Sequence, residues 1–424
     1  MRRRAFATTC VWLMCVGIAR MLCAAPAVPV YAGPWDERPA LLGDWAGTRT
    51  PMLENGMLWA VDETTFYEGV ASGGREQQFT FAGHGDILLN WDMSKVGFQE
   101  GFFVKVRAEH RYGESIGPST GSFLPATILT QLPIANSEQV YLTDVLFTQA
   151  LSENFAVYAG KMDTFDGDSN TFAHGRGKDQ FSNFGFVVNP LLIRAVPYST
   201  LGTGFVILKD KQPLFVFNVL NAVDTTNSVG INQLFNEGCV LAAELHLNHE
   251  IAGYVGHQVM GGAWNSREFA TLGQDPRIIL PDVPINRQDS TWALYYNFDQ
   301  YLVHYTGTPG TGWGVFGRAS IGDDQTNPFA WFLSTGIGGN SPIAGREAKD
   351  TFGVGYYYLA TSDEIGPFLT AALGPIGDGH GVEMFYNYAA TPWFHLTPNL
   401  QILEPEPETV DTAVVVGLRG KIVF

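Results

Sequence analysis

The end of the chain alternates apolar and charged residues, and this pattern limits the fold more than any other feature. In the closing segment VVVGLRGKIVF, Val416, Leu418 and Ile422 fall on one parity, whereas Arg419 and Lys421 fall on the other. A β-strand points successive side chains to opposite faces, so the segment predicts a strand with one apolar and one cationic face. In a soluble sandwich the apolar face would point inward. In a membrane barrel it would face lipid and leave the cations in the lumen.

The same alternation recurs along the chain, in short segments separated by turns rich in Gly, Asn, Asp or Pro. In GFFVKVRAEHRYG, apolar Val104 and Val106 alternate with charged neighbours, and GWGVFGRAS and GVEMFYNYAATPW follow the same scheme. Charged residues make up 16% of the chain, fewer than the exposed face of a soluble sandwich normally carries. Beyond the N-terminal region, no apolar run has the length of a spanning helix. A membrane chain without such helices must close its strands into a barrel, because lipid cannot satisfy open strand edges.

The first 32 residues have the layout of a secretory signal peptide. Three arginines follow the initial Met, an apolar stretch covers residues 5–19, and small residues up to Ala32 suit a cleavage site. A cut near Ala24 or Ala25, or retention of the stretch as a membrane anchor, are the alternatives. Three of the four cysteines lie in this region, which leaves Cys239 without a partner for an internal disulfide.

A segment with helix signals stands between the signal peptide and the barrel. In LLGDWAGTRTPMLENGM, Asp44 and Thr50 are candidate N-caps, Pro51 suits a first helical turn, and the Asn-Gly pair can end the helix. We therefore expect residues 33–58 to hold a short helix and residues 59–424 to form the barrel.

A series of segments resembles one family of outer-membrane proteins. Besides LLGDWAGTRTPMLENG, the segments are VYAGKMDTFDGD, FSNFGFVVNP, GWGVFGRASIGDD, SPIAGREAKDTFGVGYYY, VEMFYNYAATPWFHLTPNLQIL and the closing strand. In this order they resemble the carbohydrate-selective outer-membrane porins of the OprB type. The resemblance implies a closed barrel of about sixteen antiparallel strands in outer-membrane lipid, and passive diffusion of small carbohydrates such as monosaccharides. It also implies that the terminal aromatic strand is the signal read by the barrel assembly machinery.

Three features depart from the family pattern. Ala46 stands where a second Gly is usual, EPEPETVDT replaces a Pro-Gly turn, and the chain from Leu214 to Tyr301 is only loosely similar. The sequence therefore leaves open which sugar is favoured, and whether the protein is a monomer or a homotrimer.

Polar side chains opposite the apolar parity are the candidates for the pore lining. They are Lys105, Arg107, Glu109, Arg111, Lys161, Asp163, Arg318, Glu383, Asn387, Arg419 and Lys421. Such groups can replace the hydrogen bonds that a sugar makes with water, provided that binding stays weak enough for release. For any one of them, a generic polar lining away from the narrowest point is the alternative.

Other classes of function compete with a sugar channel. An anion or phosphate channel, or a general diffusion porin, would use the same barrel, but Glu109 and Glu383 interrupt any ladder of cations. A secreted β-rich carbohydrate-binding module would share the strands, but the low charge and the terminal Phe424 disfavour it. The net charge of −17 disfavours nucleic acid as a partner, because its phosphates would be repelled.

No motif predicts catalysis, a metal site or a cofactor. GESIG at residues 113–117 has the pattern of a nucleophile elbow but is followed by loop rather than helix. DGDSN, starting at Asp166, lacks the Gly and Glu of a calcium loop, and His246 and His249 stand three apart in a strand-like segment. GTPGTGWG lacks the Lys of a phosphate-binding loop. We therefore expect a channel rather than an enzyme.

Overall fold

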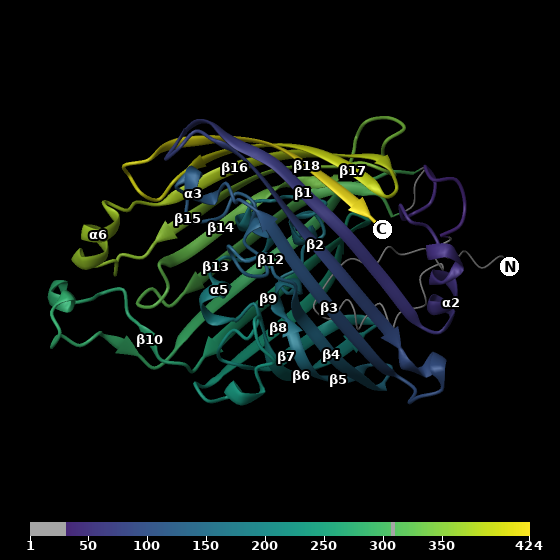
Figure 1. Cartoon of the computed structure of the whole chain (residues 1–424), viewed down its shortest axis with the longest axis horizontal. Helices are drawn as coiled ribbons and strands as arrows, with labels where there is room; N and C mark the ends of the chain where they lie inside the picture. The colour runs from purple at the N-terminus through teal and green to yellow at the C-terminus, as the bar shows by residue number, and fades with distance from the viewer. Residues whose placement is uncertain (1–30, 307–309) are drawn as a thin grey trace.

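The computed structural model describes residues 31–306 and 310–424 and forms a closed β-barrel (Figure 1). Residues 1–30, which hold nearly all of the predicted signal peptide, lie outside the described residues. None of the helices in the described ranges combines the length and apolar character needed to cross a membrane.

Sixteen strands form the barrel wall, and β1 pairs with β18 to close it. All neighbouring pairs in the wall are antiparallel, as the sequence predicts. In chain order the wall strands are β1 (Met57–Gly74), β2 (Phe79–Asp92), β3 (Phe102–Gly113), β4 (Tyr141–Ser152), β5 (Phe155–Asp163), β6 (Ser199–Lys209), β7 (Gln212–Asn221), β8 (Cys239–Ile251), β9 (Tyr254–Asn265), β12 (Thr291–His304), β13 (Gly312–Gly322), β14 (Phe329–Asn340), β15 (Thr351–Thr361), β16 (Gly379–Thr391), β17 (Phe394–Glu404) and β18 (Asp411–Val423). The predicted fold class, a closed antiparallel barrel of about sixteen strands, is confirmed.

The remaining elements of the described residues are short; η1 and α2 precede β1, and the others lie in the connections between wall strands. The α-helices are α2 (Arg49–Glu54), α3 (Gly117–Thr120), α4 (Phe184–Val187), α5 (Leu192–Ala195) and α6 (Pro367–Leu373). The 3-10 helices are η1 (Trp45–Gly47), η2 (Met93–Val96), η3 (Ile128–Thr130), η4 (Thr164–Asp166), η5 (Gly175–Gly177), η6 (Ile231–Gln233) and η7 (Pro276–Ile279). A separate hairpin pairs β10 (Phe269–Ala270) with β11 (Arg287–Gln288).

The two ends of the barrel differ. Helix α2 and the C-terminus lie at one end, whereas hairpin strand β10 and helix α6 lie at the other (Figure 1). Connections at the first end include the two-residue turns 153–154 and 210–211. The long connections 114–140, 164–198 and 266–290 all lie at the opposite end. Short periplasmic turns and long extracellular loops are typical of outer-membrane barrels, so the chain termini mark the periplasmic end.

The apolar parity of the strands faces outward. In β18, Leu418 is exposed on the outer surface, whereas Arg419 is buried and donates to the backbone of loop 164–198 inside the barrel. In β3, the outward residue Val104 pairs with Phe147, which is exposed on β4. The ambiguity of the closing segment is therefore resolved: its cations point into the barrel and its apolar side chains form the outer wall.

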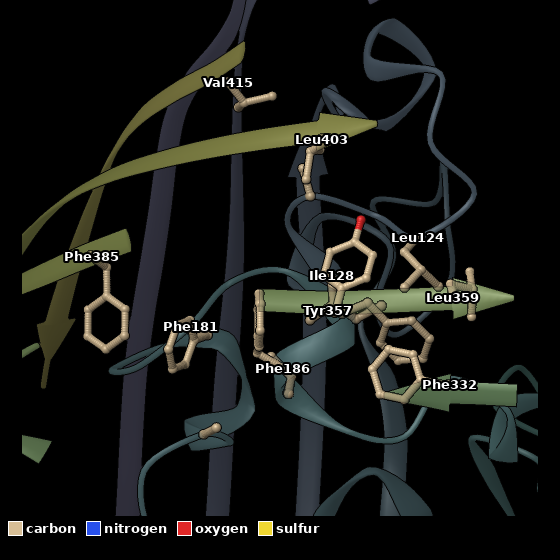
Figure 2. Close-up of a cluster of buried hydrophobic side chains, with 14 of the residues drawn as sticks. Leu124, Ile128, Phe181, Phe186, Phe332, Tyr357, Leu359, Phe385, Leu403 and Val415 are labelled. Carbon is tan, nitrogen blue, oxygen red and sulfur yellow. The ribbon is translucent and has the colours of Figure 1, made fainter. Parts of the chain in front are cut away.

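Loop 164–198 packs against strands β13, β15 and β16 through an aromatic cluster (Figure 2). Phe181 of this loop lies 4.7 Å from Phe186, 5.4 Å from Phe316 of β13 and 4.9 Å from Phe385 of β16, between ring centroids. Phe186 is 5.7 Å from Tyr357 of β15. We call these five side chains the aromatic cluster. It fills part of the lumen and fixes the loop to β13, β15 and β16.

The N-terminal segment fastens the two ends of the barrel chain. Arg49 of α2 donates to the carbonyl of Phe424 at 2.7 Å and to that of Trp59 at 2.9 Å. Its guanidinium lies between the rings of Tyr31 and Trp45, at 4.0 and 4.5 Å from their centroids. Helix α2 begins at Arg49 after the N-cap residue Thr48, so neither Asp44 nor Thr50 is its N-cap as predicted. Asp44 instead precedes η1, and its carboxylate accepts the Thr50 N–H at 2.6 Å.

Placing a charge on the outer wall tests its orientation. We expect Leu418→Arg, in the middle of β18, to lower the free energy of unfolding by up to about 2–4 kcal/mol, because the arginine would enter hydrocarbon. Leu418→Met should change it little, since volume-conserving apolar substitutions are tolerated. Urea titration of the barrel refolded in lipid vesicles measures both. Equal stability of the two variants would contradict a lipid-facing Leu418.

Candidate functional site

An ion-pair network joins loop 164–198 to the wall strands β1–β5. Lys105 of β3 places its Nζ 2.7 Å from Asp144 of β4 and 3.1 Å from Asp166 of the loop. Arg107, two residues further along β3, contacts Asp166 at 2.8 Å, Asp163 at 2.7 Å and Asp86 of β2 at 3.4 Å. The lumen face of β3 is therefore covered by the loop through charged side chains.

The loop supplies two cations to the same network. Arg176, held at a positive φ of 51°, lies 2.7 Å from Glu109 and 2.9 Å from Asp163. Its second terminal nitrogen lies 2.5 Å from Asp166. Lys178 reaches the opposite side of the network, 2.9 Å from Asp86 and 2.8 Å from Asp62. A left-handed arginine is uncommon, so these contacts hold a backbone conformation that is unfavourable on its own.

The network holds more carboxylates than cations. Its four cations are Lys105, Arg107, Arg176 and Lys178, and its six carboxylates are Asp62, Asp86, Glu109, Asp144, Asp163 and Asp166. Burial opposes ionisation of Asp166, but Arg107, Arg176 and Lys105 outweigh it and hold the pKa of this carboxyl well below its usual range. Burial likewise opposes the charge of Arg176, yet its carboxylate neighbours raise the pKa of the guanidinium well above its usual value. Both groups are therefore charged at neutral pH.

A second set of polar contacts holds the loop against β13. Arg318 lies 2.9 Å from Asp168 of the loop and donates to the carbonyls of Phe186 at 2.8 Å and Ala173 at 2.6 Å. His174 is buried beside them, with its Nδ1 2.8 Å from the carbonyl of Val187. Burial lowers the pKa of His174 to about 4, so the imidazole is neutral at pH 7 and its Nδ1–H donates this hydrogen bond.

Strands β16 and β18 complete the attachment. Glu383 accepts from the Ser182 N–H at 2.8 Å and from the Asn183 N–H at 2.9 Å. Arg419 donates to the carbonyls of Gly177 at 2.7 Å and Gln180 at 2.6 Å, and Lys421 Nζ lies 2.7 Å from Asp179.

Most of the predicted pore-lining residues thus meet at loop 164–198 instead of standing free along the lumen. Lys105, Arg107, Glu109 and Asp163 belong to the ion-pair network, and Arg318, Glu383, Arg419 and Lys421 bind other parts of the loop. Two lie elsewhere on the inner side. Arg111 donates to the carbonyl of Gly113 near the extracellular end, and Asn387 lies 2.7 Å from His395.

Lys161 is the exception, because its side chain lies on the outer side of the barrel and not in the lumen as predicted. It pairs across the sheet with Val145 and Leu201, on the opposite face of β5 from the inward Tyr158. Its Nζ donates to backbone carbonyls of loop 222–238, at 2.8, 3.3 and 2.9 Å. Lys161 therefore does not line the lumen, because the loop folds down to bind its ammonium on the outer side.

The sequence analysis missed the loop cations Arg176 and Lys178 and the carboxylates that they bind. Both cations stand in AHGRGKDQ, which has no strand alternation and so gave no parity from which to place them. Asp166 lies in the DGDSN segment, which lacks the Gly and Glu of a calcium loop and therefore predicted no site. A signal was present, since the segment from Asp163 to Asp179 concentrates acids and bases in a chain that is poor in charge. Within the described ranges, no group of three or more His, Cys, Asp or Glu is arranged to hold a metal ion.

The opposite side of loop 164–198 borders a cavity of about 130 Å³ against β7–β9 and β12. Leu192, Val196, Leu220 and Ala263 are among its mainly apolar lining. The lining also includes polar side chains such as Asp168, Asn218 and Glu244, but its surface is mainly apolar, so a sugar there would exchange water for few hydrogen-bond partners. The charged side of the loop is therefore the better candidate for contact with a polar solute.

Comparison with known proteins identifies the family. The profile of the carbohydrate-selective porin family, OprB, matches residues 76–424. The chain belongs to this family. No curated protein matches the sequence.

Among solved structures, the porin is similar to the high-pH structure of Pseudomonas putida OprB, with a TM-score of 0.78 and 18% identity over 92% of this chain and 100% of that one. The low-pH structure of the same protein gives a TM-score of 0.56 and 15% identity, over 92% and 99% of the two chains. OmpT of Vibrio cholerae gives 0.50 and 11% identity, over 87% and 97%.

The family and the barrel place the porin in the outer membrane, where it forms a channel for carbohydrates. The predicted family, fold class and location are confirmed. At identities below one fifth, the solved structures support the fold alone, so the favoured sugar has to be argued from this chain.

Removing Arg176 tests the anchoring role of the network. Arg176→Met leaves Glu109 and Asp163 buried beside an apolar side chain, and breaking a buried ion pair in this way costs about 3–5 kcal/mol. We expect loop 164–198 to detach, which increases the single-channel conductance and the current noise. Arg277→Met, which removes an exposed pair with Asp275, is the matched control and should conduct as the wild type does. Wild-type conductance in Arg176→Met would contradict the anchoring role.

His174 should make the attachment of the loop depend on pH. Its pKa is lowered to about 4 in the attached loop and returns to its ordinary value of about 6.5 once the loop is released. The released form therefore binds more protons as the pH falls from about 6.5 to about 4, and attachment weakens by up to about 3 kcal/mol over this window. Amide hydrogen exchange of loop 164–198 in the intact porin measures the change. His174→Gln keeps a donor for the Val187 carbonyl but cannot titrate, so a pH dependence that survives in this variant would exclude His174 as its source.

Proposed function

We propose that this porin lets small carbohydrates such as monosaccharides cross the outer membrane by passive diffusion. Membership of a carbohydrate-selective family supports a sugar as the solute. Loop 164–198 is attached to strands β1–β5 by the ion-pair network and to strands β13 and β16 by the aromatic cluster. A loop that is fixed on both sides of the lumen supports a narrow passage. A narrow passage favours a single sugar ring over longer saccharides.

The rim of the ion-pair network is the proposed contact for the sugar. The side chains of Lys105, Asp166 and Asp62 stay 11%, 13% and 16% exposed, whereas Glu109 and Asp163 are fully covered. A neutral polyol passing this rim can donate hydroxyl hydrogens to the carboxylates and accept from the ammonium, in place of water. Because the network neutralises most of its own charge, the sugar competes for only a few hydrogen-bonding positions. Binding therefore stays weak enough for release.

The composition of the network weighs against an anion or phosphate channel. Its carboxylates outnumber its cations by six to four, and each cation already contacts at least two carboxylates. An anion approaching the rim would gain no unpaired cation and would be repelled by Asp62 and Asp166. A neutral solute is the better match.

Block of ion current by sugar tests the proposal. In planar bilayers, glucose should reduce the current of the wild-type porin, and the concentration that halves the current is the measured quantity. We expect Lys105→Met to raise this concentration about tenfold, since a hydrogen bond to a charged group contributes about 1.5–3 kcal/mol. Lys105→Arg keeps a cationic donor and should preserve block.

Two controls separate sugar contact from loop damage. Lys349→Met, at an exposed position of the periplasmic turn 341–350, should leave block unchanged. The sugar-free conductance of Lys105→Met should equal that of the wild type, because Arg107 and Arg176 still hold Asp166 of the loop, whereas a detached loop would raise the conductance. Absence of block by any monosaccharide in the wild type, together with block by phosphate, would overturn the proposal in favour of an anion channel.

A further inference from the structure

A cavity of about 130 Å³ lies inside the barrel, between loop 164–198 and the wall strands β7–β9 and β12. Small residues form its wall side: Ala242 of β8 and Ala263 of β9 face each other across the sheet, and both line the cavity. Leu220 of β7 lines it beside them. The hollow therefore depends on two alanines, because a longer side chain at either position would fill it.

Two buried apolar clusters hold the lining of the cavity in place. Phe165 and Phe184 of the loop belong to the cluster that packs on β13, β15 and β16. Leu220 and Ala263 belong to a second cluster, and Leu192 of α5 packs against both clusters. The lining is thus fixed on each side before a solute arrives, and a preformed site loses less conformational entropy on binding.

Most polar groups of the lining are bonded within the chain. Tyr295 donates to Glu244 at 2.5 Å, and Asn218 accepts from Tyr158 at 2.7 Å. Asp168 forms an ion pair with β13 at 2.9 Å. These groups therefore need no partner from a solute.

Asn189 is the exception. The residue lines the cavity and is 1% exposed. Its Oδ1 accepts the Leu191 N–H at 3.1 Å, which fixes the orientation of the amide, and its Nδ2 makes no hydrogen bond within the described part of the chain. No other polar side chain of the lining has a buried atom without a partner there. A buried donor of this kind costs free energy until an acceptor reaches it, so the cavity favours a solute with an acceptor oxygen.

The volume and the lining of the cavity together define the class of solute. The cavity is close in size to an engineered apolar cavity of about 150 Å³ that binds benzene, so it has room for one aromatic ring. The rings of Phe165, Phe184 and Tyr295 in the lining offer edge and face contacts to such a ring. A whole sugar ring fits less well, because it carries several hydroxyl groups and Asn189 supplies a single free donor.

The cavity opens to water, because two of its lining residues are partly exposed. Ile193 is 64% exposed, and the side chain of Glu244 is 15% exposed. We propose that the cavity binds the aromatic ring of an aryl glycoside whose sugar part stays in the lumen. The oxygen that joins ring and sugar then accepts a hydrogen bond from Asn189. This binding rests on the proposed function, since the sugar part is what brings such a solute into the channel.

Paired glycosides test the cavity in planar bilayers. Phenyl β-glucoside and methyl β-glucoside carry the same sugar, and only the first carries an aromatic ring. In the wild-type porin, we expect phenyl β-glucoside to halve the current at a concentration at least about tenfold lower, since removing a phenyl group from water is favourable by this factor or more. Ala263→Leu fills part of the cavity and should make the two concentrations equal, with that of methyl β-glucoside unchanged.

A matched substitution separates the cavity from general effects on the barrel. Ala319→Leu makes the same change on the outer face of β13, next to the inward Arg318, and should preserve the wild-type difference between the glycosides. Equal concentrations in the wild type, or a difference that survives Ala263→Leu, would overturn binding in the cavity and leave sugar passage intact. If neither glycoside blocks the wild type, both the cavity site and the proposed function are wrong.

Photolabelling locates the aromatic ring without any substitution. On irradiation of the wild-type porin with 4-azidophenyl β-glucoside, we expect modified peptides from residues 184–198 and from β7–β9. Excess phenyl β-glucoside should protect these peptides, whereas the same concentration of methyl β-glucoside should not. Modification confined to β3 at the rim of the ion-pair network, or of no peptide that lines the cavity, would contradict the assignment even if Ala263→Leu failed to fold.

Discussion

Hydrocarbon cannot hydrogen-bond to a peptide group, so every backbone amide and carbonyl at membrane depth needs a partner within the protein. The pairing of β1 with β18 meets this need, because it removes the two free edges that a sheet of sixteen strands would otherwise leave. Closure also fixes what each side chain faces, since apolar and polar residues alternate along the strands. The segment before β1 secures the seam from the periplasmic end, where Arg49 binds the carbonyls of both Trp59 and Phe424.

A barrel of this size needs interior structure if it is to be selective, and loop 164–198 supplies it. The loop is held by two different kinds of contact on opposite walls. On β1–β5 it is held by buried ion pairs, which lose much of their Coulomb energy to desolvation but demand one geometry. On β13, β15 and β16 it is held by aromatic packing, which gains energy from area but allows more freedom. Together they give the loop both a defined position and adequate stability, and they leave only a thin rim of the ion-pair network in contact with water.

Strands β1–β3 carry ionisable residues on both faces. Asp62 and Glu109 belong to the ion-pair network inside, whereas the next residues along the chain, Glu63 and His110, lie 3.6 Å apart on the outer wall. A carboxylate in the lumen is held by loop cations, whereas Glu63 on the outer wall is held by Tyr112 and His110 of the nearby strand β3. The two faces of the wall differ in this way because the inner face meets water and loop residues, whereas the outer face meets hydrocarbon.

The sequence by itself determined the fold class and the facing of most strand residues. Alternation, low charge and the lack of a spanning apolar run required a closed barrel, and strand parity assigned Arg419 and Lys105 inward and Leu418 outward. The prediction that Lys161 points into the lumen was wrong, because it assumed that a charged side chain faces inward. Loop 222–238 instead binds this ammonium on the outer side of the barrel. The ordered motifs also identified the family, since each resembles a known segment in the same order along the chain.

Only the tertiary structure decided what those inward residues contact. Arg176 and Lys178 lie in a loop without periodicity, so nothing local to the sequence tells which wall the loop meets or which carboxylates it covers. Nor does the sequence show what Glu63 contacts, because its neighbours Gly85 and His110 come from two other strands and their register sets the row. Local pattern fixes the direction of a side chain, since backbone geometry repeats every two residues. Its partner depends on contacts between distant segments, and these form only when the chain closes into a barrel and folds a loop inside it.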